Sequence, residues 1–73
     1  MAVMNDIRPR FTVETERDER WWAIRVAELP GVFSQARTRH EVEPMARDAI
    51  ALLLDVHSDA FELTVRERHT GAT

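Results

Sequence analysis

Hydrophobic and polar residues alternate along three separate stretches of this 73-residue chain. In each stretch, every second residue is mainly apolar and the residues between them are mainly polar. The apolar positions are Phe11, Val13 and Thr15, then Trp22, Ile24 and Val26, and near the C-terminus Phe61, Leu63 and Val65. A period of two is typical of a strand with one buried face, so the pattern predicts three such strands.

A different period follows Thr38. Apolar residues recur there at intervals of three and four, which indicates one face of an amphipathic helix. We expect this face to consist of Val42, Met45, Ala46, Ala49, Leu53 and Val56. Thr38 and Glu41 have the spacing of a capping box, in which each side chain bonds the free backbone N–H of the other residue. Pro44 lacks an N–H, so it should kink or fray the first helical turn.

Two turns connect the predicted strands. Residues 17–20, RDER, form a polar turn that lacks the glycine favoured by tight hairpins. In the ELPG segment, Pro30 supplies the φ of the second position of a type II turn and Gly31 the positive φ of the third. Residues 32–37 then predict a short additional strand that leads directly into the helix.

The predicted order of elements is βββαβ, which gives an α+β fold with a four-stranded mixed sheet and one helix packed on one face. The last strand returns parallel to the first through the helix. We assign residues 10–68 to this single domain, residues 1–9 to a flexible N-terminal arm and residues 69–73 to a C-terminal tail. One helix leaves the opposite sheet face uncovered, and a chain this short buries only about 60% of its unfolded surface. We therefore predict a homodimer or a higher homo-oligomer that forms through that face.

Composition narrows the possible functions. The chain has no cysteine, which excludes disulfides and thiolate zinc sites. Its longest apolar run, residues 49–54, is too short to span a bilayer, and the N-terminus lacks the pattern of a signal peptide, so we expect a cytoplasmic protein. A net charge of −3 argues against direct nucleic-acid binding and suits a basic protein partner.

Candidate catalytic groups are few. Glu14 and Glu16 alternate to the polar face of their strand, whereas a metal-dependent nuclease needs carboxylates that converge on its cations. Asp55, His57 and Asp59 could form a small metal or acid–base site, but we interpret them as a helix end. His57 would interact favourably with the negative end of the helix dipole, and Asp59 would help to form the following turn. We predict no enzymatic activity, no bound metal and no cofactor.

The adjacent Trp21 and Trp22 must point to opposite faces of their strand. Trp22 continues the apolar face, so Trp21 should point away from the helix. Trp21 is then either a partly exposed side chain that shields arginine stems or an anchor for a protein partner, since aromatic residues are enriched at interfaces. We favour the partner contact.

Residues 11–66, and above all WWAIRVAELPGVFSQARTRHEVEPMARDAIALLL, resemble the HicB-like antitoxin family. The family pattern is an acidic turn with glycine, an aromatic-rich strand, Leu-Pro-Gly, Ser/Thr-Gln-Gly, then Thr and a helix rich in Ala, Glu and Leu. The most specific matches are Leu29-Pro30-Gly31, Ser34-Gln35, Thr38 and Glu41. The chain departs from the pattern at the turn without glycine, at Ala36 and at Pro44.

This resemblance implies a partial RNase H-like fold that has lost the nuclease carboxylates. It also implies an antitoxin that binds and occludes a small HicA-like mRNA-cleaving toxin. Many members carry a C-terminal DNA-binding segment, for which we expect no room in this chain. The alternative is an orphan HicB-like domain that self-associates as a structural or regulatory oligomer without a toxin.

We expect the toxin contacts to come from the acidic turn, the outward tryptophan and the start of the ELPG turn. These candidate residues are Asp18, Glu19, Trp21, Glu28 and Leu29. Four further residues should shape the backbone around them, namely Pro30, Gly31, Thr38 and Glu41.

Overall fold

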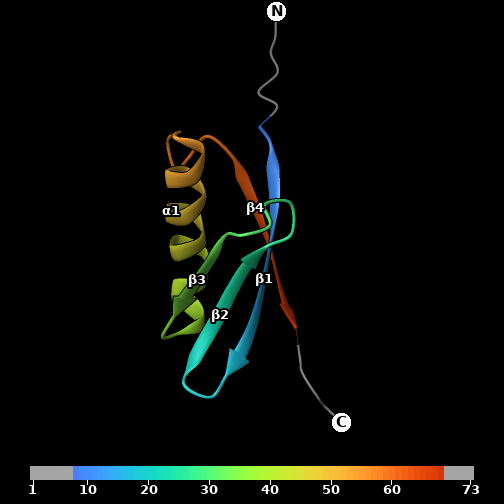
Figure 1. The fold of residues 1–73 in the computed structure, drawn as a ribbon, viewed down its shortest axis with the longest axis vertical. Helices are drawn as coiled ribbons and strands as arrows, with labels where there is room; N and C mark the ends of the chain where they lie inside the picture. Colours follow the sequence, from blue (N-terminus) through green and yellow to red (C-terminus); the bar gives the residue numbers. More distant parts are fainter. Residues whose placement is uncertain (1–7, 69–73) are drawn as a thin grey trace, which may run out of the picture.

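The structure is a computed structural model that describes residues 8–68, so most of the predicted N-terminal arm and the predicted tail 69–73 lie outside the described residues. Its elements are β1 (Arg10–Asp18), β2 (Trp21–Val26), β3 (Phe33–Ala36), the 3₁₀ turn η1 (Arg39–Glu41), α1 (Val42–Leu54) and β4 (Glu62–Arg68). Helix α1 packs on one side of the sheet (Figure 1). The predicted α+β fold, with its βββαβ order, is confirmed.

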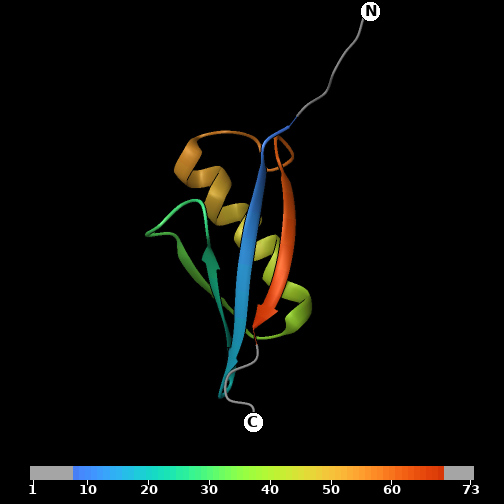
Figure 2. The ribbon, with the colours of Figure 1, turned by 90° about the vertical axis from the view of Figure 1, so that its right-hand side faces the viewer.

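The four strands lie in the order β3-β2-β1-β4. β1 pairs antiparallel with β2, and β2 pairs antiparallel with β3. β4 returns beside β1 in parallel, which is possible because α1 carries the chain across the sheet. β1 and β2 are therefore central, β3 and β4 form the two edges, and α1 lies behind the sheet in Figure 2.

Two buried clusters fill the space between α1 and the sheet. The first consists of Val13, Ile24, Ala36, Val42 and Ala46. The second consists of Val26, Val32, Ile50 and Phe61. Thr15 also lies at a buried inward position, where its hydroxyl donates a hydrogen bond to the Ala23 carbonyl at 2.8 Å. Most strand positions that face the helix are thus apolar, as the alternation predicts, and Ser34, opposite Ile24, is a polar exception.

The predicted core face of α1 is only partly right. Val42 and Ala46 are buried, but the centre of the contact also includes Ile50, which the prediction omitted. Met45, Leu53 and Val56 were expected in the core and are exposed instead. At about 100° per residue, the apolar positions from Leu52 round to Ile50 cover about 160° of the helix circumference. Met45 and Leu52 lie at one side of that arc, beyond the part that the sheet covers. Leu53 lies in the middle of the arc but in the last turn of α1, and Val56 comes after the helix has ended.

The predicted capping box does not form. The Thr38 side chain makes no capping hydrogen bond, and the Glu41 carboxylate accepts from the backbone N–H of Arg37 at 3.2 Å. The reason is η1, which inserts a 3₁₀ turn: Thr38 caps η1, whereas Glu41 is the residue before α1. Pro44 is consequently the third residue of α1, where an N–H has no intrahelical partner, and it removes no hydrogen bond there.

The turns follow the sequence more closely. Val32 N–H donates to the Leu29 carbonyl at 3.1 Å, and Gly31 has φ 97, as the predicted type II turn requires. Glu19 occupies the β1–β2 turn with φ 59, so a non-glycine residue adopts the left-handed conformation there. Asp55 ends α1 with φ 58, and the next N–H returns to the Ala51 carbonyl as in a Schellman motif.

Candidate functional site

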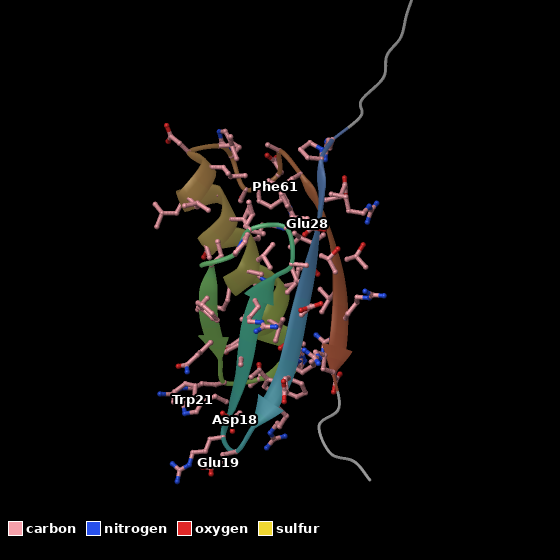
Figure 3. All side chains as sticks on the ribbon, turned by 45° about the vertical axis from the view of Figure 1, so that its right-hand side comes forward. Asp18, Glu19, Trp21, Glu28 and Phe61 are labelled. Atoms are coloured by element: carbon pink, nitrogen blue, oxygen red, sulfur yellow. The ribbon has the colours of Figure 1, made fainter. Side chains whose placement is uncertain are left out.

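Three of the five predicted partner-binding residues lie together at the tip of the β1–β2 hairpin. Asp18, Glu19 and Trp21 are exposed and adjacent at this end of the sheet (Figure 3). Trp21 keeps 38% of its surface exposed although the Arg37 guanidinium lies 5.5 Å from its ring centroid. Trp22 packs against the first core cluster, which confirms that the two tryptophans face opposite sides. We call Asp18, Glu19 and Trp21 the hairpin tip; these two carboxylates and one aromatic ring are bordered by Arg17, Arg20 and Arg37.

Glu28 and Leu29 lie at the opposite end of β2, away from the hairpin tip (Figure 3). The six residues of β2 separate the two groups by about 20 Å, at about 3.3 Å per residue. Leu29 is half-buried against the second core cluster. The structure thus divides the five predicted residues into two places, and only the hairpin tip gathers several of them.

The Glu28 carboxylate is exposed, but it is already hydrogen-bonded to another residue of the chain. It accepts from Thr12 N–H at 2.7 Å and from the Thr12 hydroxyl at 2.8 Å. The backbone bond from Thr12 is the main cause that lowers the pKa of Glu28 below its usual value, partly opposed by burial, which raises it. Glu28 therefore braces the start of β1 against the end of β2. Its partner lies 16 residues away, so no local spacing could have revealed this role.

The four predicted motif residues stand apart from both groups. Pro30 and Gly31 form the exposed ELPG turn that leads into β3. Thr38 precedes η1, and Glu41 is its last residue, directly before α1. They set the path of the backbone from β2 to α1. Of the four, only the last two depart from the conformation that the sequence predicted.

The uncovered face of the sheet is charged. Glu14 on β1 lies opposite Arg25 of β2 and Arg66 of β4, and the Arg25 guanidinium is 3.6 Å from its carboxylate. Glu16 in the same way lies opposite Arg68. Glu14 and Glu16 are thus matched by arginines, and the same face also carries Trp21 opposite Asp18 and Phe33 opposite Arg25. The predicted association through this face stays a prediction, and its exposed apolar area comes from Trp21 and Phe33.

A further exposed apolar surface lies between the end of α1 and the start of β3. Phe33 is 69% exposed and Leu52 is 84% exposed. A shallow groove, here named the α1–β3 groove, is lined by Gly31, Val32, Phe33, Ala49, Leu52 and Leu53. Sequence reasoning missed this surface because it assigned Ala49 and Leu53 to the core and gave Leu52 no role. The signal was present in the run 49–54, which is apolar at every position.

The residues considered for metal or acid–base chemistry lie at the end of α1 and in the connection that follows it. Asp55 ends α1, and His57 and Asp59 are exposed in the connection to β4. Within residues 8–68, no three His, Cys, Asp or Glu side chains lie close enough together to hold a metal ion. Over the same residues, no helix has both the length and the apolar character to cross a membrane.

Comparisons of the chain with protein-family models, with curated proteins and with solved structures find no match. The resemblance to HicB-like antitoxins therefore rests on the sequence motif itself. That motif, Leu29 to Glu41, corresponds in the structure to one continuous connection: the ELPG turn, β3 and η1.

Proposed function

We propose that this chain is a HicB-like antitoxin that binds and occludes a small HicA-like mRNA-cleaving toxin, in the cytoplasm and without catalysis of its own. The observation that carries the proposal is the ordered motif from Leu29 to Glu41 inside a βββαβ domain. The apolar strand positions that face α1, together with the pairing of Glu14 and Glu16 with arginines, favour binding over hydrolysis.

The hairpin tip is the surface that we assign to the toxin. Its carboxylates, Asp18 and Glu19, can approach a basic RNA-binding surface, and Trp21 offers the aromatic area that commonly anchors an interface. The net charge of −3 favours the encounter with a basic protein. Glu28 is left out of this surface because both of its carboxylate oxygens already bind Thr12. Steric cover of the toxin would then deny it access to mRNA.

The decisive probe is the product of a short neighbouring reading frame that encodes a basic HicA-like protein. Titration calorimetry should show binding, and the chain should suppress RNA cleavage by that protein at equimolar concentration. Trp21→Ala and the pair Asp18→Asn with Glu19→Gln should each weaken binding about tenfold or more. Asp48→Asn, an exposed carboxylate change on α1, is the matched control and should leave affinity within a factor of about two. Failure of the basic protein to bind would overturn the proposal.

The absence of catalysis is tested on the chain alone. With magnesium or manganese, the purified protein should hydrolyse no RNA. Hydrolysis that copurifies with the protein and disappears in a Glu14→Gln variant would contradict a purely binding role.

The second candidate is an orphan HicB-like domain that self-associates as a structural or regulatory oligomer with no toxin. The exposed α1–β3 groove favours this candidate, because an apolar surface of that kind marks an interface. The two candidates differ in one observation. An orphan domain has no basic partner, and its hairpin-tip variants behave as the wild type in every association assay.

A further inference from the structure

α1 carries a second apolar stripe beside the one that it buries. Met45, Ala49 and Leu52 recur at intervals of four and three, so they lie on one side of the helix. Leu52 is the most exposed of the large apolar side chains on the described residues, and Met45 is exposed as well. Residues on the opposite flank have other partners: Arg47 binds the loop before β4. The second stripe therefore faces the β3 side of the molecule and is left without cover.

β3 is an edge strand, so one side of its backbone has no neighbouring strand. Its sequence, Phe33-Ser34-Gln35-Ala36, contains no charged residue and no proline. Such an edge is open to pairing with another strand, because charges and prolines are the usual means of preventing it. Phe33 extends the α1–β3 groove along this edge. An unprotected strand edge and an exposed apolar groove thus lie on the same side of the molecule.

We propose that this side is the interface with a second copy of the chain, formed by antiparallel pairing of β3 with β3 of the other copy. A two-fold axis perpendicular to the sheet relates the copies, so each uses the same surface. The result is one continuous sheet of eight strands. Because this axis leaves the sheet faces in place, both α1 helices lie on the same face and bring their Leu52 stripes together.

The charge distribution favours a second copy over a basic partner at this surface. Each copy has a net charge of −3, yet none of the six residues that line the groove is charged. Two copies can therefore meet here without placing like charges in contact. A basic protein would instead have to desolvate its cations against apolar side chains without a carboxylate to receive them.

A stable dimer needs an interface of a typical size. A standard interface covers about 800 Å² per partner, roughly 15% of the 5216 Å² surface of this chain. The strand edge, the groove and the exposed flank of α1 together form a continuous side of the molecule. Association there would stabilise a domain that is small enough to have only a thin core. This inference does not depend on the toxin, since the hairpin tip is not part of the interface.

The first test compares two leucines of α1. Leu52 and Leu54 are both exposed, but they are two residues apart and therefore point to opposite sides of the helix. In sedimentation equilibrium at micromolar concentration, the chain should be a dimer. Leu52→Arg should weaken dimerisation about tenfold or more, and Leu54→Arg should leave it within a factor of about two. Equal effects of the two changes, or a monomeric wild type at about 100 μM, would overturn the proposal.

The second test does not depend on the folding of Leu52→Arg. The chain has no cysteine, so a single introduced cysteine reports one contact. In an antiparallel pair about a two-fold axis, facing Cα atoms are about 4.5–5.5 Å apart, within the range of a disulfide. Only a residue at or next to the axis faces its own counterpart, so single cysteines are introduced in turn at positions 33 to 36 of β3. At least one of them should give a disulfide-linked dimer on mild oxidation, whereas Thr64→Cys on β4 should not. Cross-linking through position 64 and not through β3 would contradict the proposed interface.

Discussion

The two edge strands of the sheet differ in charge. β4 ends one side with Glu62, Arg66, Glu67 and Arg68, and a charged strand edge is protected against further pairing. β3 ends the other side with no charge at all. The same helix borders both edges, yet it presents Arg47 toward β4 and Leu52 toward β3. We call the β4 side closed, because charged residues and Arg47 protect it from further contacts, and the β3 side open, because its strand edge and groove have no such protection.

Closure on the β4 side depends on one arginine. Arg47 donates to the Ser58 carbonyl at 2.6 Å and to the Phe61 carbonyl at 3.0 Å, and it also bonds Glu43 at 3.3 Å. Its guanidinium lies 5.3 Å from the centre of the Phe61 ring. Phe61 in turn meets Phe11 edge to face at 5.6 Å. Helix, loop and strand are joined at this point, whereas the side of α1 that borders β3 presents Ala49, Leu52 and Leu53.

The largest difference between the edges should appear when the same residue type is truncated on each side. Phe61 is 2% exposed, so Phe61→Ala should lower the free energy of unfolding by about 3–5 kcal/mol. Phe33→Ala on the open edge should change it by less than about 0.5 kcal/mol. Both are measured by urea denaturation in a Leu52→Arg background, which keeps the chain monomeric. Comparable losses at the two sites would show that the β3 edge is as closed as the β4 edge.

A smaller effect should follow from removal of the arginine itself. Arg47→Ala should cost about 2 kcal/mol, because hydrogen bonds from a charged donor to two backbone carbonyls are lost. Arg47→Lys should recover only part of the loss, since a single ammonium lacks the planar geometry of the guanidinium. Arg66→Ala, an exposed arginine on β4, is the control. If Arg47→Ala is as neutral as the control, the arginine does not close this side.

The strands and turns could be predicted because their signals are local. A period of two requires only that one face meets the core, and Pro30 followed by Gly31 specifies the turn through backbone conformation alone. Because connections between strands are short and parallel crossovers are right-handed, the order βββαβ allows few sheet topologies. For the same reason, the opposite facing of the two tryptophans was predictable from their adjacency.

Features that depend on contacts between distant residues were not predictable. The Glu28 brace and the Arg47 contacts join residues that are 11 to 16 positions apart, where no periodic pattern applies. The helix start was misassigned because the Thr38–Glu41 spacing fits a 3₁₀ turn as well as a capping box. The core face of α1 was misassigned because an apolar arc does not indicate how much of it the sheet will cover.

The turn that begins the open edge gives the next prediction. Gly31 has φ 97, and a Cβ added there would meet no atom within 4 Å. Gly31→Val should therefore destabilise by about 1–3 kcal/mol through backbone strain alone, without a steric clash. Gly31→Asn should cost less, because asparagine tolerates the left-handed region. Equal costs for valine and asparagine, measured by thermal unfolding, would show that something other than φ restricts this position.

The smallest effect is the one that separates an open side from a closed one most directly. Leu52 is 84% exposed, so Leu52→Gln removes little buried surface, and glutamine is about as good a helix former as leucine. Unfolding at a concentration below dimerisation should change by less than about 0.5 kcal/mol. Ile50→Ala, two residues earlier on the buried stripe, should cost about 2–5 kcal/mol under the same conditions. At high concentration, Leu52→Gln should instead lower the apparent stability, since a dimer that binds only folded chains adds stability by mass action. A large loss of unfolding free energy in the dilute monomer would mean that Leu52 belongs to the core and that the β3 side is not an open surface. A loss that appears only at high concentration assigns Leu52 to the contact between two chains.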